Sequence, residues 1–222
     1  MTALNFTVTM TISLENVIPD FLEKEKVEAS KTWNNPVTIN KGEKIQIVAP
    51  SGSGKTSLIH FLYGLRKDYS GKILLDKKNI KDFTAEDFSI TRSSVCSIIF
   101  QDLRLFPDHT VFENINIKRS LNPFHGEERI KEMTARLGIE NKLNKLVRTC
   151  SYGEQQRIAI IRALQQPFDF LLMDEPFSNL DDTNRKKAME LIEEEVAKRS
   201  ASIILADLKR LDFFNADRII YL

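Results

Sequence analysis

The sequence predicts an α/β fold with a mostly parallel sheet, an antiparallel β subdomain at the N-terminus and an inserted α-helical subdomain. Three observations lead to this prediction. An apolar strand runs through a glycine-containing loop into a helix over residues 45–62, and apolar residues alternate over 5–18. From residue 151 onward, helical and strand patterns alternate, which is typical of parallel strands joined by crossover helices.

The N-terminal elements follow from period-two alternation and turn residues. Over residues 5–18, one face of the predicted strand carries Phe6, Val8, Met10, Ile12 and Leu14. Two strands are expected within 36–48 around a turn at 40–42, one over 71–76 before a turn at 77–79, and one buried strand over 94–100.

The remaining elements divide the chain. Residues 110–147 have helical spacing broken by glycine and proline, which predicts a helical insertion. The later elements are expected as helix 152–165, strand 168–173, helix 182–199, strand 201–206, a short helix and strand 217–222. We therefore predict one domain over 1–222, with residues 1–100 and 165–222 as the core with its β subdomain and 101–164 as the helical subdomain.

Composition excludes several classes of protein. The 222 residues carry 32 basic and 31 acidic side chains, so bulk charge does not indicate a nucleic-acid partner. The cysteines, Cys96 and Cys150, do not have the spacing of a metal site or a disulfide framework, which favours a reducing compartment. Neither a membrane-spanning apolar run nor a signal peptide is recognised, so we expect a protein that is soluble by itself.

The segment 45–62 has the order that a nucleoside triphosphate requires. Backbone N–H groups of a glycine-containing loop and the following helix N-terminus bind phosphates. Lys55 can reach the β- and γ-phosphates, and Thr56 can ligate Mg²⁺. The alternative is a chance Gly-Ser turn before a core helix, although strand, loop and helix all agree with the first interpretation. The expected contacts with ATP come from Ser51, Gly52, Ser53, Gly54, Lys55, Thr56 and Ser57.

The loop has one departure from the usual pattern, because Ala49 stands where a glycine is common. Pro50 holds Ala49 in the extended region, where alanine is tolerated.

A second signal is the apolar run 170–173 followed by Asp174 and Glu175. The run places Asp174 at the carboxyl end of a buried strand, where ligands bind in such sheets. We expect Asp174 to hold Mg²⁺ through water and Glu175 to polarise the attacking water. The alternative is an acidic strand end before a proline turn.

A third signal lies at 150–157, where Ser151 and Glu154 form a capping box for the next helix. A capped helix N-terminus is also an anion site, so a structural and a functional interpretation coexist here.

With these signals in order, the chain resembles the ATP-binding subunit of an ABC transporter over nearly its whole length. The family's signature loop reads Leu-Ser-Gly-Gly-Gln; here Cys150 and Tyr152 replace the first and third residues, Ser151 and Gly153 are kept, and Glu154 follows. The resemblance implies that Ser151, Gly153 and Glu154 face the ATP held by a second subunit. It also implies ATP and Mg²⁺ as cofactors.

Other positions fit the same family. Gln101 resembles its glutamine-loop residue near Mg²⁺ and the water, and Asp181 its dimer-contacting loop. Residues 106–114 resemble the stretch that meets the membrane subunit. Phe21 stands where an aromatic ring stacks on adenine, with Trp33 as a rival candidate.

One position breaks the pattern, because Ala206 stands where the family has a histidine that contacts the γ-phosphate. Loss of such a donor typically costs about 100- to 1000-fold in rate. Two functions therefore compete. The first is an ATPase subunit that drives a permease, in the style of the lipoprotein-release, cell-division and macrolide-export branch. The second is a slowly hydrolysing, ATP-gated regulatory clamp.

A soluble ABC ATPase of translation or repair is a weaker alternative, since such proteins usually carry two cassettes or long insertions. The resemblance implies a homodimer, or a heterodimer with a histidine-bearing ATPase. It implies an integral-membrane permease as partner, no nucleic acid, and a cytoplasmic location at the inner face of the cell membrane.

Overall fold

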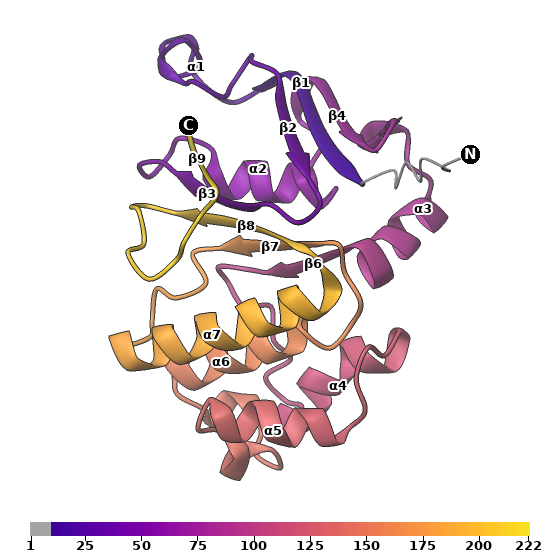
Figure 1. Ribbon diagram of the computed structural model, residues 1–222, viewed down its shortest axis with the longest axis vertical. Coiled ribbons are helices and arrows are strands. Elements are labelled where there is room, and N and C mark those ends of the chain that lie inside the picture. Colours follow the sequence, from indigo (N-terminus) through magenta and orange to yellow (C-terminus); the bar gives the residue numbers. More distant parts are fainter. Residues whose placement is uncertain (1–9) are drawn as a thin grey trace, which may run out of the picture.

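The computed structural model describes residues 10–222 (Figure 1). The beginning of the strand predicted over 5–18, including Phe6 and Val8, lies outside the described residues.

The N-terminal part contains an antiparallel sheet with the strand order β2-β1-β4-β5. Its strands are β1 (Thr11–Pro19), β2 (Val37–Asn40), β4 (Tyr69–Leu75) and β5 (Lys78–Asn79). The β1–β4 register shifts between Glu15 and Ile18, where Asn16 has a φ of +49°. Gly71 packs against this bulge, since a Cβ there would lie 2.3 Å from the Asn16 carbonyl oxygen. The predicted antiparallel subdomain is present.

The second sheet is parallel throughout, with the order β6-β7-β8-β3-β9. Its strands are β3 (Lys44–Val48), β6 (Cys96–Ile99), β7 (Phe170–Asp174), β8 (Ser202–Asp207) and β9 (Arg218–Tyr221). Parallel strands are buried on both faces, which explains the nearly continuous apolar runs in β7 and β8. Because the strands share a direction, their carboxyl ends meet at one edge.

Helices cover both faces of the parallel sheet. Helix α2 lies between the two sheets, α6 and α7 cover the opposite face, and α4 and α5 lie beyond them (Figure 1). The helices are α1 (Lys24–Ala29), α2 (Lys55–Leu62), α3 (Ala85–Ile90), α4 (Val111–Leu121), α5 (Glu128–Arg136), α6 (Tyr152–Ala163) and α7 (Asp182–Arg199). The helical insertion predicted from residues 110–147 is formed; the domain limits at 100 and 165 stay a prediction.

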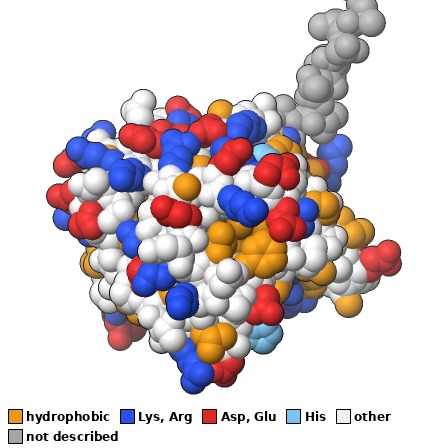
Figure 2. Space-filling view, turned by 90° about the horizontal axis from the view of Figure 1, so that it is seen from below, with side chains coloured by type: hydrophobic (Ala, Val, Ile, Leu, Met, Phe, Trp, Pro, Cys, Tyr) orange, Lys and Arg blue, Asp and Glu red, His pale blue; other side chains and the backbone are white. Residues whose placement is uncertain are grey.

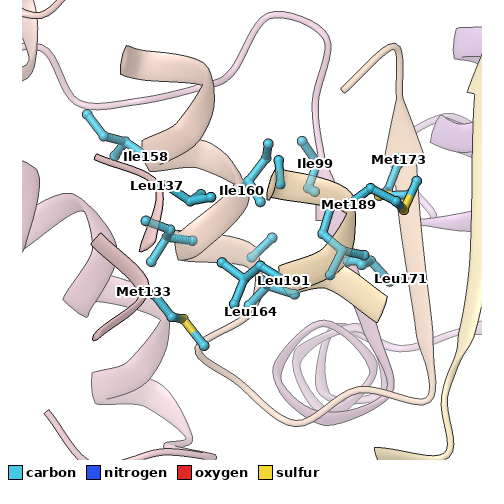
Figure 3. Packing of buried hydrophobic residues seen from close by; sticks show 14 of the residues in the cluster. Ile99, Met133, Leu137, Ile158, Ile160, Leu164, Leu171, Met173, Met189 and Leu191 are labelled. Atoms are coloured by element: carbon cyan, nitrogen blue, oxygen red, sulfur yellow. The ribbon is translucent and has the colours of Figure 1, made fainter. Parts of the chain in front are cut away.

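Two apolar clusters form the core, one on each face of the parallel sheet. The cluster under α6 and α7 interlocks side chains from strands and helices, including Leu171, Met173, Ile160 and Leu191 (Figure 3). The other cluster joins the antiparallel sheet and α2 to the opposite face. Successive strand residues alternate between the clusters, so that Leu205 faces α7 and Ala206 faces α2.

A buried ion cluster ties the helical part to α7. The Glu195 carboxylate is fully buried and accepts hydrogen bonds from Arg129 and Arg199, both at 2.7 Å, and contacts His125 at 2.5 Å. Burial alone raises the pKa of Glu195, but the hydrogen bonds from Arg199, His125 and Arg129 outweigh it and lower that pKa to about 2. The cluster therefore holds the segment before α5 against the core.

One predicted element is wrong. The short helix expected after β8 is absent, and residues 208–217 form turns and bends. The buried Gln46 side chain donates to the Lys209 carbonyl at 2.9 Å and accepts from the Leu211 N–H at 3.3 Å. Asp207 Oδ1 accepts from the Leu208 N–H at 2.7 Å. These bonds satisfy the backbone groups that a helix would have used.

Candidate nucleotide-binding and catalytic site

The predicted phosphate loop connects β3 to α2. Gly52 and Gly54 have φ values of +78° and +99°, which only glycine adopts without strain. A Cβ on Gly54 would also lie 3.0 Å from the Trp33 ring. The loop thus turns the free N–H groups of the first turn of α2 toward the space where phosphate would lie.

Trp33 has a supporting role that the sequence did not indicate. Its ring is only 1% exposed, and its indole N–H donates to the Ser53 carbonyl at 3.1 Å. The rival assignment of Trp33 to adenine therefore does not fit, because its ring faces are covered. Phe21 is 48% exposed and lines the same cavity as the phosphate loop, so its adenine role stays a prediction. The Arg66 guanidinium lies 4.8 Å from the Phe21 ring centre.

Lys55 lies within the loop that it is expected to serve. Its side chain is 5% exposed, and its ammonium donates to the Pro50 carbonyl at 3.1 Å. The same nitrogen lies 3.8 Å from Glu175 Oε1. Lys55, the only positive side chain of residues 49–56, therefore lies between the phosphate loop and the acidic end of β7.

Asp174 ends β7 with its carboxylate buried, and neither oxygen has a hydrogen-bond partner. Burial raises the pKa of Asp174 to about 6; the nearby Thr56 hydroxyl and Lys55 ammonium oppose this rise, and the charge of Glu175 adds to it. An orphaned buried carboxylate costs free energy unless a cation balances it.

Thr56 and Gln101 lie close by, with the Thr56 hydroxyl 3.4 Å from Gln101 Oε1. Together with Asp174 they line one cavity, and these oxygens are the ligands that Mg²⁺ prefers. The residues present therefore fit a magnesium ion. Within residues 10–222, no cluster of three or more His, Cys, Asp or Glu side chains offers a different kind of metal site.

Glu175 follows directly and has a φ of +44°, a conformation that non-glycine residues rarely adopt. Its N–H donates to the Ala206 carbonyl at 2.9 Å, which holds this conformation against β8. The Gln101 amide lies 3.5 Å from Glu175 Oε2. Strained residues of this type persist where the surroundings fix them, and they concentrate at functional sites.

The signature segment begins α6. Ser151 caps the helix by accepting from the Glu154 N–H at 3.3 Å, and Glu154 accepts from the Ser151 N–H at 2.8 Å. The predicted capping box is therefore formed, and Lys142 lies 3.2 Å from Glu154. Gly153 packs closely, since a Cβ there would lie 3.0 Å from the Asn179 carbonyl.

Tyr152, which replaces a glycine of the signature, is 50% exposed. It lines the same cleft as Thr56, Gln101 and Asp174 of its own chain. The substitution therefore adds an aromatic ring at the edge of the proposed metal site.

Gln156 is a site residue that sequence reasoning missed. Its buried side chain accepts from the Asn179 N–H at 2.9 Å and lies 3.4 Å from both the Glu175 carbonyl and the Ser178 hydroxyl. It joins the signature helix to the segment after β7. Asp181, in that segment, caps α7 by accepting from the Asn184 N–H at 2.9 Å.

Ala206 is fully buried beside Asp174 in the β7–β8 register. Its methyl group faces the α2 side of the sheet and cannot donate a hydrogen bond. Burial raises the pKa of Asp207, whose carboxylate accepts a hydrogen bond from the Leu208 N–H.

The β3 strand, the phosphate loop and the acidic end of β7 together define a P-loop nucleotide-binding protein.

Comparisons with known proteins extend this assignment. The family described as "ABC transporter" matches residues 34–178. The chain is 36% identical over 183 residues to the lipoprotein-releasing system ATP-binding protein LolD of Buchnera aphidicola, covering 80% of this chain and 78% of that protein. It is 31% identical over 173 residues to the cell division ATP-binding protein FtsE of Bacillus subtilis, covering 77% and 75%.

Other relatives are longer. The molybdate/tungstate import ATP-binding protein WtpC of Pyrococcus horikoshii is 36% identical over 179 residues, covering 79% of this chain. This chain spans 48% of the length of WtpC and 59% of that of the glucose import ATP-binding protein GlcV of Saccharolobus solfataricus. Among solved structures, the dimeric post-hydrolysis state of the ATP-binding cassette MJ0796, bound to ADP and Pi, has a TM-score of 0.78 and 27% identity, covering 95% of this chain and 94% of that chain.

The chain therefore belongs to the ABC transporter family, and its fold is that of the family's ATP-binding cassette. The predicted fold class is confirmed. The resemblance to the lipoprotein-release and cell-division branch is supported by relatives named for those two systems.

Proposed function

We propose that this chain is the ATP-binding and ATP-hydrolysing subunit of an ABC transporter, which dimerises around MgATP to drive or regulate a membrane permease. The observation that supports this most strongly is the convergence of five side chains from three segments at one edge of the parallel sheet. These are Lys55, Thr56, Gln101, Asp174 and Glu175. Contacts of 3.4–3.8 Å link the other four, and Asp174 lines the same cavity as Thr56 and Gln101.

The geometry supports a division of roles. The N–H groups of residues 52–56 and the Lys55 ammonium would bind the phosphates, with Lys55 exchanging the Pro50 carbonyl for phosphate oxygens. Thr56 and Gln101 would hold Mg²⁺ directly, and Asp174 through water. When bound, that ion neutralises phosphate charge. Glu175 would orient the attacking water and take up its proton, held in place by its bond to β8.

The second subunit would complete the site. Ser151, Gly153 and Glu154 lie at the N-terminus of α6, where N–H groups and the helix dipole favour an anion. In the proposed dimer this end faces the ATP of the partner subunit, and the Asp181 segment lies at the dimer contact. We infer a homodimer, because symmetric pairs are the commonest assemblies. Intact mass of the purified native complex would reveal one ATPase species; two species would show a heterodimer.

The permease partner is proposed from an exposed surface of the helical part. Within residues 10–222, no helix has both the length and the apolar character needed to cross a bilayer. Phe106 is 48% exposed on the segment before α4, and the face below α4 and α5 shows apolar side chains among mixed charges (Figure 2). We propose that this face docks on an integral-membrane subunit, which would place the chain at the cytoplasmic side of the cell membrane.

The experiment is a steady-state ATPase assay with Mg²⁺, with and without the co-purified permease. Lys55→Ala is the control without phosphate binding, and Glu175→Gln the control that binds without turnover. Mg²⁺-dependent hydrolysis that both variants abolish supports the proposal. ATP binding without any turnover in the complete complex would instead identify a regulatory clamp, an alternative that the names of the relatives do not favour.

A further inference from the structure

The loop after Gln101 contains two consecutive non-glycine residues in the left-handed region. Leu103 has a φ of +59° and Arg104 a φ of +47°. Each such residue costs about 1–3 kcal/mol and persists only where its surroundings hold it. The Arg104 N–H donates to the Asp102 carbonyl at 2.6 Å, which tightens the turn.

The contact that holds this turn comes from α6. Arg162 lies near the end of α6 and is 9% exposed. One terminal nitrogen of its guanidinium, Nη2, donates to the Leu103 carbonyl at 2.6 Å, and the other, Nη1, to the Arg104 carbonyl at 2.7 Å. Among the described residues, no carboxylate forms an ion pair with it. The buried cation is therefore satisfied by the carbonyls of the two strained residues.

The direction of these carbonyls depends on the left-handed conformation. If either residue relaxed to a negative φ, its carbonyl would rotate away and leave one of the two guanidinium nitrogens without its partner. The planar guanidinium offers two donor nitrogens in a fixed arrangement, one for each oxygen, whereas an ammonium has a single nitrogen and no fixed fork. Gln101 directly precedes the turn formed by residues 102–104. Its side chain lies 3.4 Å from the Thr56 hydroxyl and 3.5 Å from the Glu175 carboxylate.

The same helix begins at the signature segment. Ser151 caps α6 and lies eleven positions before Arg162, a distance of about 16 Å along a helix that rises about 1.5 Å per residue. A short, packed helix moves as one body, so a displacement at Ser151 moves the guanidinium as well.

We propose that Arg162 is a positioning residue, which fixes the turn after Gln101 and makes the placement of Gln101 depend on the signature helix. The inference rests on the proposed function. In the dimer, Ser151 senses the nucleotide of the partner subunit, and the Arg162 fork transmits the position of α6 to the site of its own subunit.

The first test is Arg162→Lys, which keeps the charge and the apolar stem but loses the fork. We expect kcat to fall about tenfold or more, while ATP affinity changes less than about twofold. Trp33 is the only tryptophan and contacts the phosphate loop, so its fluorescence reports ATP binding. Without nucleotide, amide hydrogen exchange of residues 101–105 should increase. Unchanged kcat and exchange would overturn the proposal.

A rescue experiment separates positioning from general stability. In the Arg162→Lys background, Arg104→Gly removes the cost of the positive φ, whereas Arg104→Ala removes the same side chain and keeps that cost. Both variants lose the stacking of Arg104 on Phe100, at 4.1 Å, so they are matched. We expect a several-fold recovery of kcat with glycine only. Equal effects of glycine and alanine would overturn the proposal.

A further variant covers the case in which Arg162→Lys does not fold. With Arg162 intact, Arg104→Pro breaks the turn by forbidding the positive φ and removing the N–H that donates to Asp102, and Arg104→Ala is the control for loss of the side chain. Loss of kcat with retained ATP binding in the proline variant alone supports the proposal, and full activity of that variant overturns it. Absence of any ATP hydrolysis by the unaltered complex would refute the proposed function itself.

Discussion

Replacing Asp174 by asparagine should stabilise the nucleotide-free protein at neutral pH while removing Mg²⁺-dependent activity. The buried carboxylate has no hydrogen-bond partner, and its pKa rises from 3.8 to about 6. At about 1.4 kcal/mol per pH unit, this rise corresponds to about 3 kcal/mol of stability lost when the group is ionised. Asparagine has no charge to bury and avoids that loss.

The pH dependence identifies the cause. The folded state holds the Asp174 proton more tightly than the unfolded state, so stability falls as pH rises between about 4 and 6. The penalty is complete above about pH 6 and nearly absent at pH 4. The stability difference between Asp174→Asn and the unaltered protein should therefore grow by roughly 2–3 kcal/mol between pH 4 and pH 7.5.

The assay is urea unfolding of both proteins at the two pH values, without nucleotide and with a chelator. Because Glu195 and the other titrating groups are the same in both proteins, their contributions cancel when the free energy of unfolding of one protein is subtracted from that of the other. In a second series without the chelator, added Mg²⁺ should stabilise the protein that keeps Asp174 more than the asparagine variant. A stability difference that stays constant with pH, or that shrinks toward pH 7.5, would refute the assignment of an orphaned, ionised carboxylate.

Three further variants test the remaining roles. Lys55→Ala should weaken ATP binding strongly at fixed Mg²⁺, and an unchanged affinity by Trp33 fluorescence would exclude this loop as the site. Glu175→Gln should still bind ATP but lose turnover and accumulate an ATP-bound dimer, detectable by size-exclusion chromatography; turnover equal to the parent would show that Glu175 is not the water-polarising residue. Ala206→His should raise kcat with little change in ATP affinity, although Ala206 is fully buried and the larger ring should cost about 1–3 kcal/mol in an unfolding titration. A slower enzyme would mean that the imidazole does not reach the phosphate.

Much of this fold follows from local patterns in the sequence. The apolar run that ends at Asp174 predicted a buried parallel strand, and Ser151 with Glu154 predicted a capped helix, because both signals depend on neighbouring residues only. The turns after β8 were missed because Gln46, far away in the sequence, binds their backbone groups.

Long-range contacts at the site could not be predicted from the sequence either. Nothing near Trp33 indicated that its indole would support Ser53, and nothing near Gln156 indicated that it would reach Asn179. Such pairs form only when the sheet brings distant segments together. The positive φ of Glu175 is likewise held by a bond to Ala206 on the neighbouring strand.

The positive φ of Glu175 lowers the stability of the folded protein, whereas its carboxylate is the group proposed to act in hydrolysis. Glycine would adopt the same backbone without the cost of about 1–2 kcal/mol that an L-residue bears there. If hydrolysis were dispensable, replacement of Glu175 by glycine would make the protein more stable at no functional cost. Under the proposed role of Glu175, the same replacement would gain stability and lose turnover.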